Sequence, residues 1–369
     1  MREKATDSRY RIDEFSAASL AGNPLNSPAE RHIHIYLPPG YYENPLERYP
    51  VVYFLHGYDG SYRKVAVFSI AADDENMAKA YSRDLLGKID LGRMPSYPLF
   101  DELIVSGKLP PFIFAQPDGS LHVPHIKGIK DFMTGLPALK GSFYINSPGT
   151  GSYEDYIINN VIEYVDSHYR TIADKSGRSI SGASMGGYGT LYLSLRHADK
   201  FAAAAALSPA NFTLDLLSWK LKVPAVELIF GVEAAKKGGR MSWDDIYDTL
   251  DMAYSKSRPL LPTVKKGPDG RVLGYDSAAA GNWQRYDLND IIMQADSPYK
   301  SVALMMNCDK DDEFGLAGAA DKLHSTLKAR TVKHEYDIYS DPMASLSPHI
   351  FGITYNIIPA VKFCLNNMK

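Results

Sequence analysis

The feature that most constrains this chain is the run Gly182-Ala183-Ser184-Met185-Gly186, which has the pattern Gly-x-Ser-x-Gly. In this pattern, a nucleophile elbow, the serine occupies a sharp turn between a buried strand and a helix, and the glycines let the two backbones pass closely. A short strand is predicted at 178–181, and apolar residues recur at helical spacing from Tyr188 to Leu195. This order predicts an exposed hydroxyl at Ser184 rather than a serine in a flexible loop. No lysine follows the glycines, as a phosphate-binding P-loop would require.

Short apolar runs alternate with helical patterns along the chain, which is typical of a mostly parallel sheet flanked by helices. The predicted fold class is therefore α/β. Strands are expected at 32–37, 51–55, 112–115, 178–181, 201–207, 302–307 and 335–339, and helices at 153–168, 188–197, 316–330 and 350–367. The first of these helices has Ser152 in the capping position and Asp155 three residues later.

Two stretches interrupt this rhythm, and the chain of 369 residues is longer than one average domain. We expect a core formed by 1–209 and 299–369, with an irregular insertion at about 62–100 and a lid or cap insertion at 210–298. In α/β folds such segments lie above the strand ends, where ligands bind. The second insertion contains all three tryptophans, and an indole offers a broad apolar face to a ligand. We therefore expect substrate-binding roles, or alternatively a small core of the insertion, for Trp219, Trp243 and Trp283.

The composition of the chain bears on its binding partners and on its cellular location. The net charge of -3, without a basic cluster, gives no electrostatic case for nucleic acid or an acidic membrane surface as a partner. No apolar run approaches the length of a membrane span, and residues 1–15 are charged throughout. A cytoplasmic location is expected, with a secreted protein lacking its signal peptide as the alternative. Cys308 and Cys364 lie in segments predicted to be buried, which favours free thiols over a disulfide.

A serine hydroxyl needs a base within hydrogen-bond reach and a third group to hold that base. In α/β hydrolases the chain order is serine, acid, histidine, so the base must follow Ser184. His197 ends the predicted helix after the serine, His324 lies within a helix, and His334 begins a strand. His349 lies in a loop between the last strand and the last helix, and it is the predicted base.

The acid is expected in a turn after a strand at the same edge of the sheet. The segment 307–314 follows the apolar run 302–306 and contains four carboxylates. We favour Asp312, with Asp311 as the alternative, and we expect Asp309 and Glu313 to be solvated turn residues. A calcium site would also gather carboxylates, but the spacing here does not match an EF-hand.

The oxyanion that forms when an ester carbonyl is attacked needs preorganised donors, usually two backbone N–H groups. Met185, directly after the nucleophile, is expected to supply one. The segment 55–60 follows the buried strand at 51–55, and there Tyr58 is expected to supply the other. His56 is expected to order this loop rather than transfer protons.

Several segments together resemble the α/β-hydrolase family of esterases that includes esterase D, feruloyl esterases and the mycolyltransferases. The segments that carry the resemblance are YLPPGY at 36–41, YPVVYFLHG at 49–57, FIFAQPDG at 112–119, YEDY at 153–156, YRTI at 169–172 and SMGG at 184–187. The resemblance implies the α/β-hydrolase fold, with Ser184 as nucleophile and His349 as base. It also supports Asp312, although Asp309 stands where the family often has glycine, which leaves Asp311 open.

The function that these residues and the resemblance imply is a serine carboxylic-ester hydrolase that works through an acyl-enzyme. The expected substrates are small-molecule esters with small or hydroxycinnamoyl-type acyl groups, including carbohydrate-linked ones. Alternatives are an acyltransferase with the same triad, a thioesterase similar to S-formylglutathione hydrolase, and a catalytically silent ligand-binding protein of the same fold. No metal or organic cofactor is expected, and a homo-oligomer is compatible with the sequence.

Overall fold

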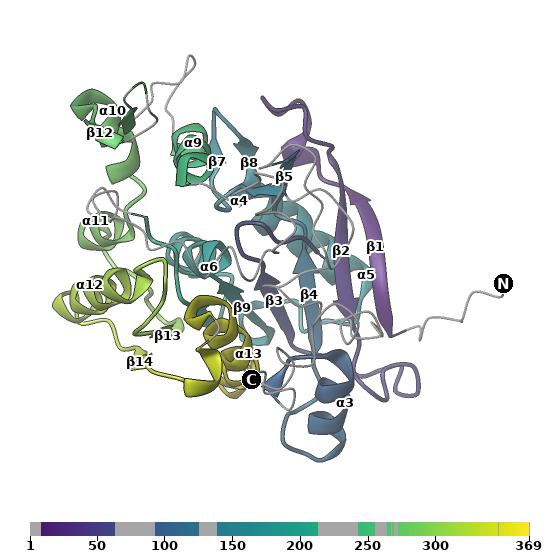
Figure 1. Ribbon diagram of the computed structural model, residues 1–369. Helices are drawn as coiled ribbons and strands as arrows, with labels where there is room; N and C mark the ends of the chain where they lie inside the picture. Colours follow the sequence, from purple (N-terminus) through teal and green to yellow (C-terminus); the bar gives the residue numbers. More distant parts are fainter. Residues whose placement is uncertain are drawn as a thin grey trace, which may run out of the picture.

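The structure is a computed structural model that describes residues 9–62, 93–124, 139–212, 243–254, 264–266, 268, 272–345 and 347–368. Its centre is an eight-stranded sheet with helices on both sides (Figure 1). The strands lie in the spatial order β1 (Tyr10–Ser16), β2 (Glu30–Tyr36), β4 (Ile113–Pro117), β3 (Val51–Leu55), β9 (Arg178–Ala183), β10 (Ala203–Leu207), β13 (Ala303–Asp309) and β14 (Glu335–Tyr339). Strand β2 is antiparallel to its neighbours β1 and β4, and the other neighbouring pairs are parallel. The predicted mostly parallel α/β sheet is confirmed.

The predicted strands correspond closely to those of the sheet. Strands β3 and β14 have the predicted bounds, and the other five predicted strands agree within two residues at either end. Strand β1 was not predicted, because Arg11, Asp13 and Glu14 make its sequence charged. It lies at the edge of the sheet, where charged side chains are common because they discourage pairing with another chain.

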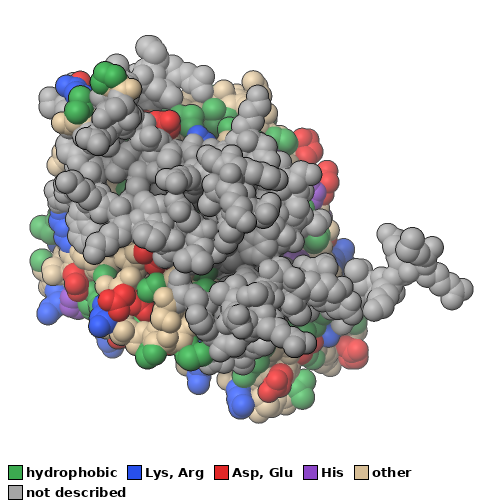
Figure 2. Space-filling view, viewed as in Figure 1, with side chains coloured by type: hydrophobic (Ala, Val, Ile, Leu, Met, Phe, Trp, Pro, Cys, Tyr) green, Lys and Arg blue, Asp and Glu red, His purple; other side chains and the backbone are tan. Residues whose placement is uncertain are grey.

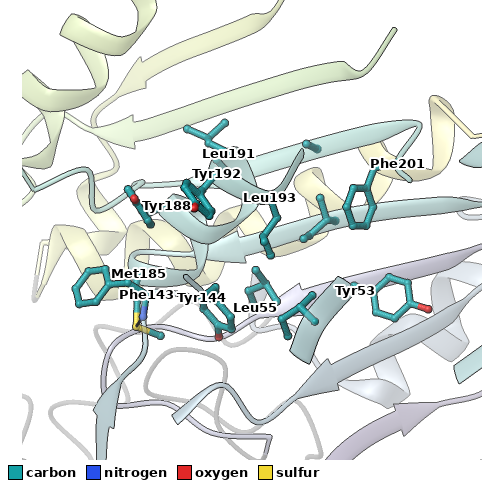
Figure 3. Packing of buried hydrophobic residues seen from close by; sticks show 14 of the residues in the cluster. Tyr53, Leu55, Phe143, Tyr144, Met185, Tyr188, Leu191, Tyr192, Leu193 and Phe201 are labelled. Atoms are coloured by element: carbon teal, nitrogen blue, oxygen red, sulfur yellow. Dashed lines mark hydrogen bonds between the residues drawn. The ribbon is translucent and has the colours of Figure 1, made fainter. Parts of the chain in front are cut away.

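The two faces of the sheet bury alternate residues of each strand, as expected for strands covered on both sides. In β3, the side chains of Val51, Tyr53 and Leu55 join one hydrophobic cluster, and those of Val52 and Phe54 join another. The first cluster is covered by α5 (Ile162–His168), α6 (Met185–Arg196) and α12 (Leu316–Ala329); the second is covered by α3 (Tyr97–Val105) and α13 (Pro348–Asn366). Figure 3 shows α6 in the first layer, with Leu193 near the strands and Met185 beside Phe143.

The predicted helix at 153–168 is present but is not a uniform α-helix. It begins as α4 (Tyr153–Asp155), continues as a π-helical segment (Tyr156–Val161), and ends as α5. Ser152 is the N-cap residue, as predicted, but its side chain makes no cap hydrogen bond. The side-chain oxygen of Asn146 accepts the N–H of Asp155 instead, at 3.1 Å. A residue that is remote from the helix start therefore supplies the cap, which local spacing could not indicate.

The described parts of 210–298 form α9 (Trp243–Tyr254), α10 (Ser277–Gln284), α11 (Leu288–Gln294) and a two-stranded sheet of β11 (Val264–Lys266) and β12 (Val272–Tyr275). Two more strand pairs lie nearer the core, β5 (Ser120–Pro124) with β6 (Leu139–Gly141) and β7 (Asn146–Ser147) with β8 (Gly151–Ser152). Short 3-10 turns occur at Ala18–Leu20, Lys175–Gly177 and Pro342–Ala344. Buried residues of α9, α10 and α11 belong to the same cluster as the α6 layer. The boundaries of the lid stay a prediction.

The predicted substrate-binding role can be compared with the structure for only one of the three tryptophans of this segment. Trp219 and the side chain of Trp243 lie outside the described residues. Trp283 is fully buried; its indole N–H donates to Asp251 at 2.7 Å, and its ring contacts Tyr254 edge-on. Its burial gives no support to the substrate-binding prediction for Trp283, and the indole packs in the hydrophobic cluster that the segment shares with the α6 layer rather than in a separate core of the insertion.

Charged and apolar side chains are intermixed on the described part of the face in Figure 2, with acidic and basic groups side by side. Within the described ranges, the structure has no helix with the length and apolar character needed to cross a membrane. Cys308 and Cys364 are free and buried, as predicted.

Candidate active site

Ser184 has the backbone geometry of a nucleophile elbow. It lies between the end of β9 and the start of α6, with φ +56° and ψ -113°, a conformation that residues other than glycine rarely adopt. Its N–H donates to the carbonyl oxygen of Leu207 at 2.8 Å, and its carbonyl accepts the N–H groups of Tyr188 and Ala210. These bonds hold the turn in its strained form, and the serine remains partly exposed beside fully buried neighbours.

The two glycines of the elbow are required by the neighbouring backbone. A Cβ atom at Gly186 would lie 2.0 Å from the carbonyl oxygen of Leu55, and one at Gly182 would lie 2.4 Å from the carbonyl oxygen of Gly186. Neither obstacle can move as a flexible side chain could, because both are backbone atoms of the central sheet and its helix. The Gly-x-Ser-x-Gly pattern is therefore explained by close packing of β3, β9 and α6.

The imidazole of His349 and the carboxylate of Asp312 form a buried hydrogen-bonded pair. His349 Nδ1 lies 2.6 Å from Asp312 Oδ2, and the Asp312 side chain is fully buried. The other carboxylate oxygen accepts the backbone N–H of Phe314 at 2.9 Å and that of Leu316 at 3.4 Å. The thiol of Cys308 lies 3.7 Å from Oδ2. Backbone donors thus fix the carboxylate while it orients the imidazole.

The remaining carboxylates of this loop have other positions. Asp311 is 61% exposed and lies 3.8 Å from Lys310. Asp309 is buried, and its carboxylate accepts the N–H groups of Asp311 and Asp341, at 2.9 and 3.2 Å. The prediction of a solvated Asp309 is therefore wrong.

Glu313, the second residue predicted to be solvated, binds the start of helix α13. Its Oε2 accepts the backbone N–H of His349 at 2.8 Å, and its Oε1 accepts the hydroxyl of Ser347. Ser347 is also the N-cap, since its Oγ accepts the N–H of Ile350 at 3.3 Å. The carboxylate thus satisfies a donor of the first helical turn, where negative charge is favourable. The prediction is wrong because Glu313 fixes the backbone that carries His349.

The loop after β3 lies beside both Ser184 and His349. A Cβ atom at Gly57 would lie 3.7 Å from Cβ of Ser184. Asp59, two residues later, is among the charges that act on His349. Since β3, β9 and β13 are parallel, the segments that follow their carboxyl ends meet at one edge of the sheet. Ser184, Asp312 and His349 therefore belong to one edge.

The charges around His349 favour its protonated form. Burial lowers the pKa of His349, but the charge and hydrogen bond of Asp312, together with the charges of Glu313 and Asp59, outweigh burial and raise the pKa above its usual 6.5. An imidazole with this environment accepts a proton more readily than a free one. It is suited to a general base that must hold the proton transiently.

The two candidate oxyanion donors lie on the same edge. Met185 is the first residue of α6, so its N–H belongs to the helix end that has no intrahelical acceptor. The Met185 side chain is buried, and its sulfur accepts the N–H of Phe143 at 3.3 Å. Tyr58 lies in the loop after β3, and its hydroxyl is 2.7 Å from that of Thr249 in α9. The contact ties the loop to the segment 210–298.

His56 is fully buried and holds two loops together. Its Nδ1 lies 2.7 Å from the carbonyl oxygen of Gly57, and its Nε2 accepts the N–H of Gly119 at 2.8 Å. These two bonds require the neutral imidazole with its proton on Nδ1. His56 therefore orders the loop that carries Tyr58, as expected from the sequence.

The family of the chain follows from comparison with known proteins. The family model described as "Putative esterase" matches residues 26–81 and 135–343, which is more than half of the chain. The chain belongs to the Esterase family. The match includes Ser184 and Asp312 and stops six residues before His349.

Among curated relatives, the Esterase-family chain is 28% identical over 204 residues to an endo-1,4-beta-xylanase/feruloyl esterase of Xylanibacter ruminicola. It is 24% identical over 210 residues to an esterase of Mycobacterium tuberculosis. These matches cover 53% and 57% of the chain, but only 22% and 34% of the two relatives, so the chain spans a fifth to a third of their length.

Solved structures of the same fold include a ferulic acid esterase, with a TM-score of 0.56, 18% identity and coverage of 96% of this chain and 97% of that one. An S-formylglutathione hydrolase from Agrobacterium tumefaciens has a TM-score of 0.53 and 17% identity, with coverage of 97% and 95%. The fold of this Esterase-family member is therefore that of the α/β hydrolases.

Proposed function

We propose that the protein is a serine carboxylic-ester hydrolase with the triad Ser184, His349 and Asp312. The observation that carries the proposal is the buried Asp312–His349 pair at the sheet edge where Ser184 is held in its strained turn. An imidazole fixed at Nδ1 presents Nε2 as the base, which is the division of roles in known serine triads. Membership of the Esterase family supports the same reaction class.

In the proposed reaction, Ser184 Oγ attacks the ester carbonyl carbon while its proton passes to His349 Nε2. The N–H groups of Met185 and Tyr58 receive the oxyanion of the tetrahedral intermediate. The intermediate collapses to the acyl-enzyme when the alkoxide leaves and takes the proton from His349. Water then attacks the acyl carbon with His349 again as base, and the carboxylic acid is released with Ser184 restored.

The proposed substrates are small-molecule esters with small or hydroxycinnamoyl-type acyl groups, including carbohydrate-linked ones. The support is the relative named an endo-1,4-beta-xylanase/feruloyl esterase and the ferulic acid esterase of the same fold. A thioesterase similar to the S-formylglutathione hydrolase is the second candidate, favoured by a TM-score of 0.53. Initial rates with methyl ferulate, acetylated sugars and S-formylglutathione separate the two, and a competing acceptor alcohol reveals any acyl transfer.

The nucleophile is tested with Ser184→Ala and with a fluorophosphonate probe. We expect Ser184→Ala to fold normally and to lose hydrolysis of p-nitrophenyl butyrate by a factor on the order of 10⁶ in kcat, together with labelling by the probe. Ser152→Ala is the matched control, because this half-buried serine makes no cap bond. Hydrolysis retained by Ser184→Ala would refute the triad, whereas an unlabelled and inactive wild-type protein would favour a silent ligand-binding protein.

A further inference from the structure

A cavity with a volume of about 320 Å³ lies at the far end of helix α6 from Ser184. Its lining includes Tyr192 and Arg196 of α6, Glu154 of α4, and Arg285 and Tyr286 from the turn between α10 and α11. Arg196 follows Ser184 by twelve positions, which corresponds to about 18 Å along an α-helix. The cavity is therefore separate from the candidate active site, and its size is near the lower limit for small-molecule sites.

Each arginine of the cavity is placed against a tyrosine ring. The guanidinium of Arg196 lies 5.4 Å from the ring centre of Tyr192, and that of Arg285 lies 4.7 Å from the ring centre of Tyr286. The two tyrosine rings are 6.4 Å apart and tilted by 50°. Stacking of this kind restricts a guanidinium before a ligand arrives, which lowers the entropy cost of binding. The wall is thus partly preorganised and aromatic.

Among the described residues the lining has one carboxylate, and protein donors already occupy it. Glu154 is buried; its Oε1 accepts Arg196 Nε at 2.7 Å and His197 Nε2 at 2.8 Å, and its Oε2 accepts the Tyr192 hydroxyl at 3.2 Å. Burial raises the pKa of Glu154, but these hydrogen bonds and charges outweigh burial and lower it, so the group is ionised. The lining therefore combines two cations with one anion whose oxygens are engaged.

The terminal nitrogens of Arg196 are the part of the lining that is suited to a ligand. Within the described residues, the hydrogen bond of Arg196 to Glu154 uses Nε, and no other hydrogen bond of this side chain is found. Its side chain is 50% exposed. Arg285 contributes its charge, while its Nη2 donates to the carbonyl oxygen of Tyr254 at 3.0 Å and to the hydroxyl of Tyr286 at 3.3 Å. A guanidinium presents paired N–H groups that match carboxylate or phosphate oxygens.

We propose that this cavity binds a small oxyanion, a carboxylate or a phosphate, between Arg196 and Arg285 and against the two tyrosine rings. The site is independent of the hydrolysis at Ser184 and does not rest on it. An aromatic carboxylate would combine contact with the guanidinium groups and contact with the rings, whereas inorganic phosphate would use the guanidinium groups alone.

The test is the thermal unfolding of the full chain in phosphate, acetate or benzoate, each compared with chloride at equal ionic strength. We expect a saturable rise in Tm with at least one of the three oxyanions and none with chloride. Arg196→Lys keeps a charge beside Glu154 but loses the paired nitrogens, and Arg285→Met removes the second charge; both should abolish the saturable rise. A larger effect of benzoate than of acetate would assign a role to the tyrosine rings.

Arg11→Met is the matched control, because Arg11 is 48% exposed, donates from Nε to Asp13 and lies over the Tyr169 ring, but does not line the cavity. A second measurement needs no variant: the saturating oxyanion should protect Arg196, but not Arg11, from phenylglyoxal in the wild-type protein. The proposal is overturned if no oxyanion gives a saturable effect, or if Arg196→Lys and Arg285→Met respond as the wild type does.

Discussion

The carboxylate of Glu313 accepts the backbone N–H of His349 at 2.8 Å. Glu313 directly follows Asp312, the candidate triad acid, and it holds the backbone of His349, the candidate base. Asp312 and Glu313 are neighbours in sequence, and they bind the side chain and the backbone of the same histidine. The loop after β13 therefore positions His349 at two points.

Removal of the hydrogen bond between Glu313 and the backbone of His349 should reduce turnover without changing substrate affinity. Glu313→Ala removes the acceptor at the start of α13 and should lower the free energy of unfolding by about 1.5–3 kcal/mol, the range for hydrogen bonds to a charged group. We expect kcat to fall while KM is little changed, because Glu313 acts through His349 rather than on the substrate. Glu313→Gln keeps an acceptor and should restore part of kcat. Equal kcat in Glu313→Ala and wild type would contradict this positioning role.

The raised pKa of His349 gives activity and stability opposite dependences on pH. In the proposed reaction His349 must be neutral to accept the serine proton, so hydrolysis should be lost as pH falls through a pKa above 6.5. A group with a raised pKa in the folded state contributes stability that is full below its unfolded pKa and is lost as pH rises through the folded one. The His349 contribution to stability should therefore decrease over the pH range in which activity increases.

The charge of Asp59 provides a specific test of this pH dependence. Asp59→Asn removes one of the carboxylates that raise the pKa of His349, so the acid limb of kcat/KM should move to lower pH. Asp296→Asn, which changes an exposed carboxylate after α11, serves as the control and should leave the limb in place. An unchanged limb in Asp59→Asn would show that the loop after β3 does not act on the base.

The close approach of Gly186 to the backbone of β3 predicts that alanine there destabilises the fold, whereas alanine at Gly281 should not. Gly186→Ala would place Cβ 2.0 Å from the Leu55 carbonyl oxygen, so we expect destabilisation of about 3 kcal/mol or more. Gly281→Ala is the control, since among the described residues outside its own helical turn no heavy atom lies within 4 Å of its Cβ position in α10. Alanine there should stabilise by about 0.5–1 kcal/mol, because glycine weakens a helix interior. Urea midpoints of the two variants measure the difference, and similar midpoints would contradict the packing argument.

Structural features that depend on neighbouring residues could be predicted from the sequence, whereas contacts between distant segments could not. The elbow was predictable because its pattern reflects contacts between adjacent segments, which only glycine permits at Gly182 and Gly186. The choice of His349 followed from its predicted place in a loop just before the last helix; in the structure α13 begins at Pro348, so His349 lies in its first turn. The role of Glu313 was not predictable, because it depends on the docking of α13 onto the loop after β13, across 36 residues.

The burial of Asp309 and Trp283 could not be predicted for a related reason. An acidic residue in a turn is usually solvated, but Asp309 is buried, and its carboxylate accepts the N–H of Asp311 in its own loop and the N–H of Asp341 from a separate segment. Trp283 is buried against Tyr254 and Asp251, which lie about 30 residues earlier in the chain. The contacts of Asp309 with Asp341 and of Trp283 with Asp251 each span 32 residues, so they are set by tertiary packing and local sequence offers no signal for them.

The sequence left Asp311 and Asp312 as alternatives for the triad acid, and the two residues now serve as test and control. Asp312→Asn should retain most of the packing but no longer stabilise a protonated His349, so kcat should fall by a factor on the order of 10³–10⁴. Asp311→Asn, at a position that is 61% exposed, should leave kcat within about twofold of wild type, because surface substitutions rarely act at a distance. Hydrolysis of p-nitrophenyl butyrate at saturating substrate compares the two variants directly. A larger loss for Asp311→Asn than for Asp312→Asn would require that the loop rearranges during the reaction and that the 2.6 Å pair is not the catalytic one.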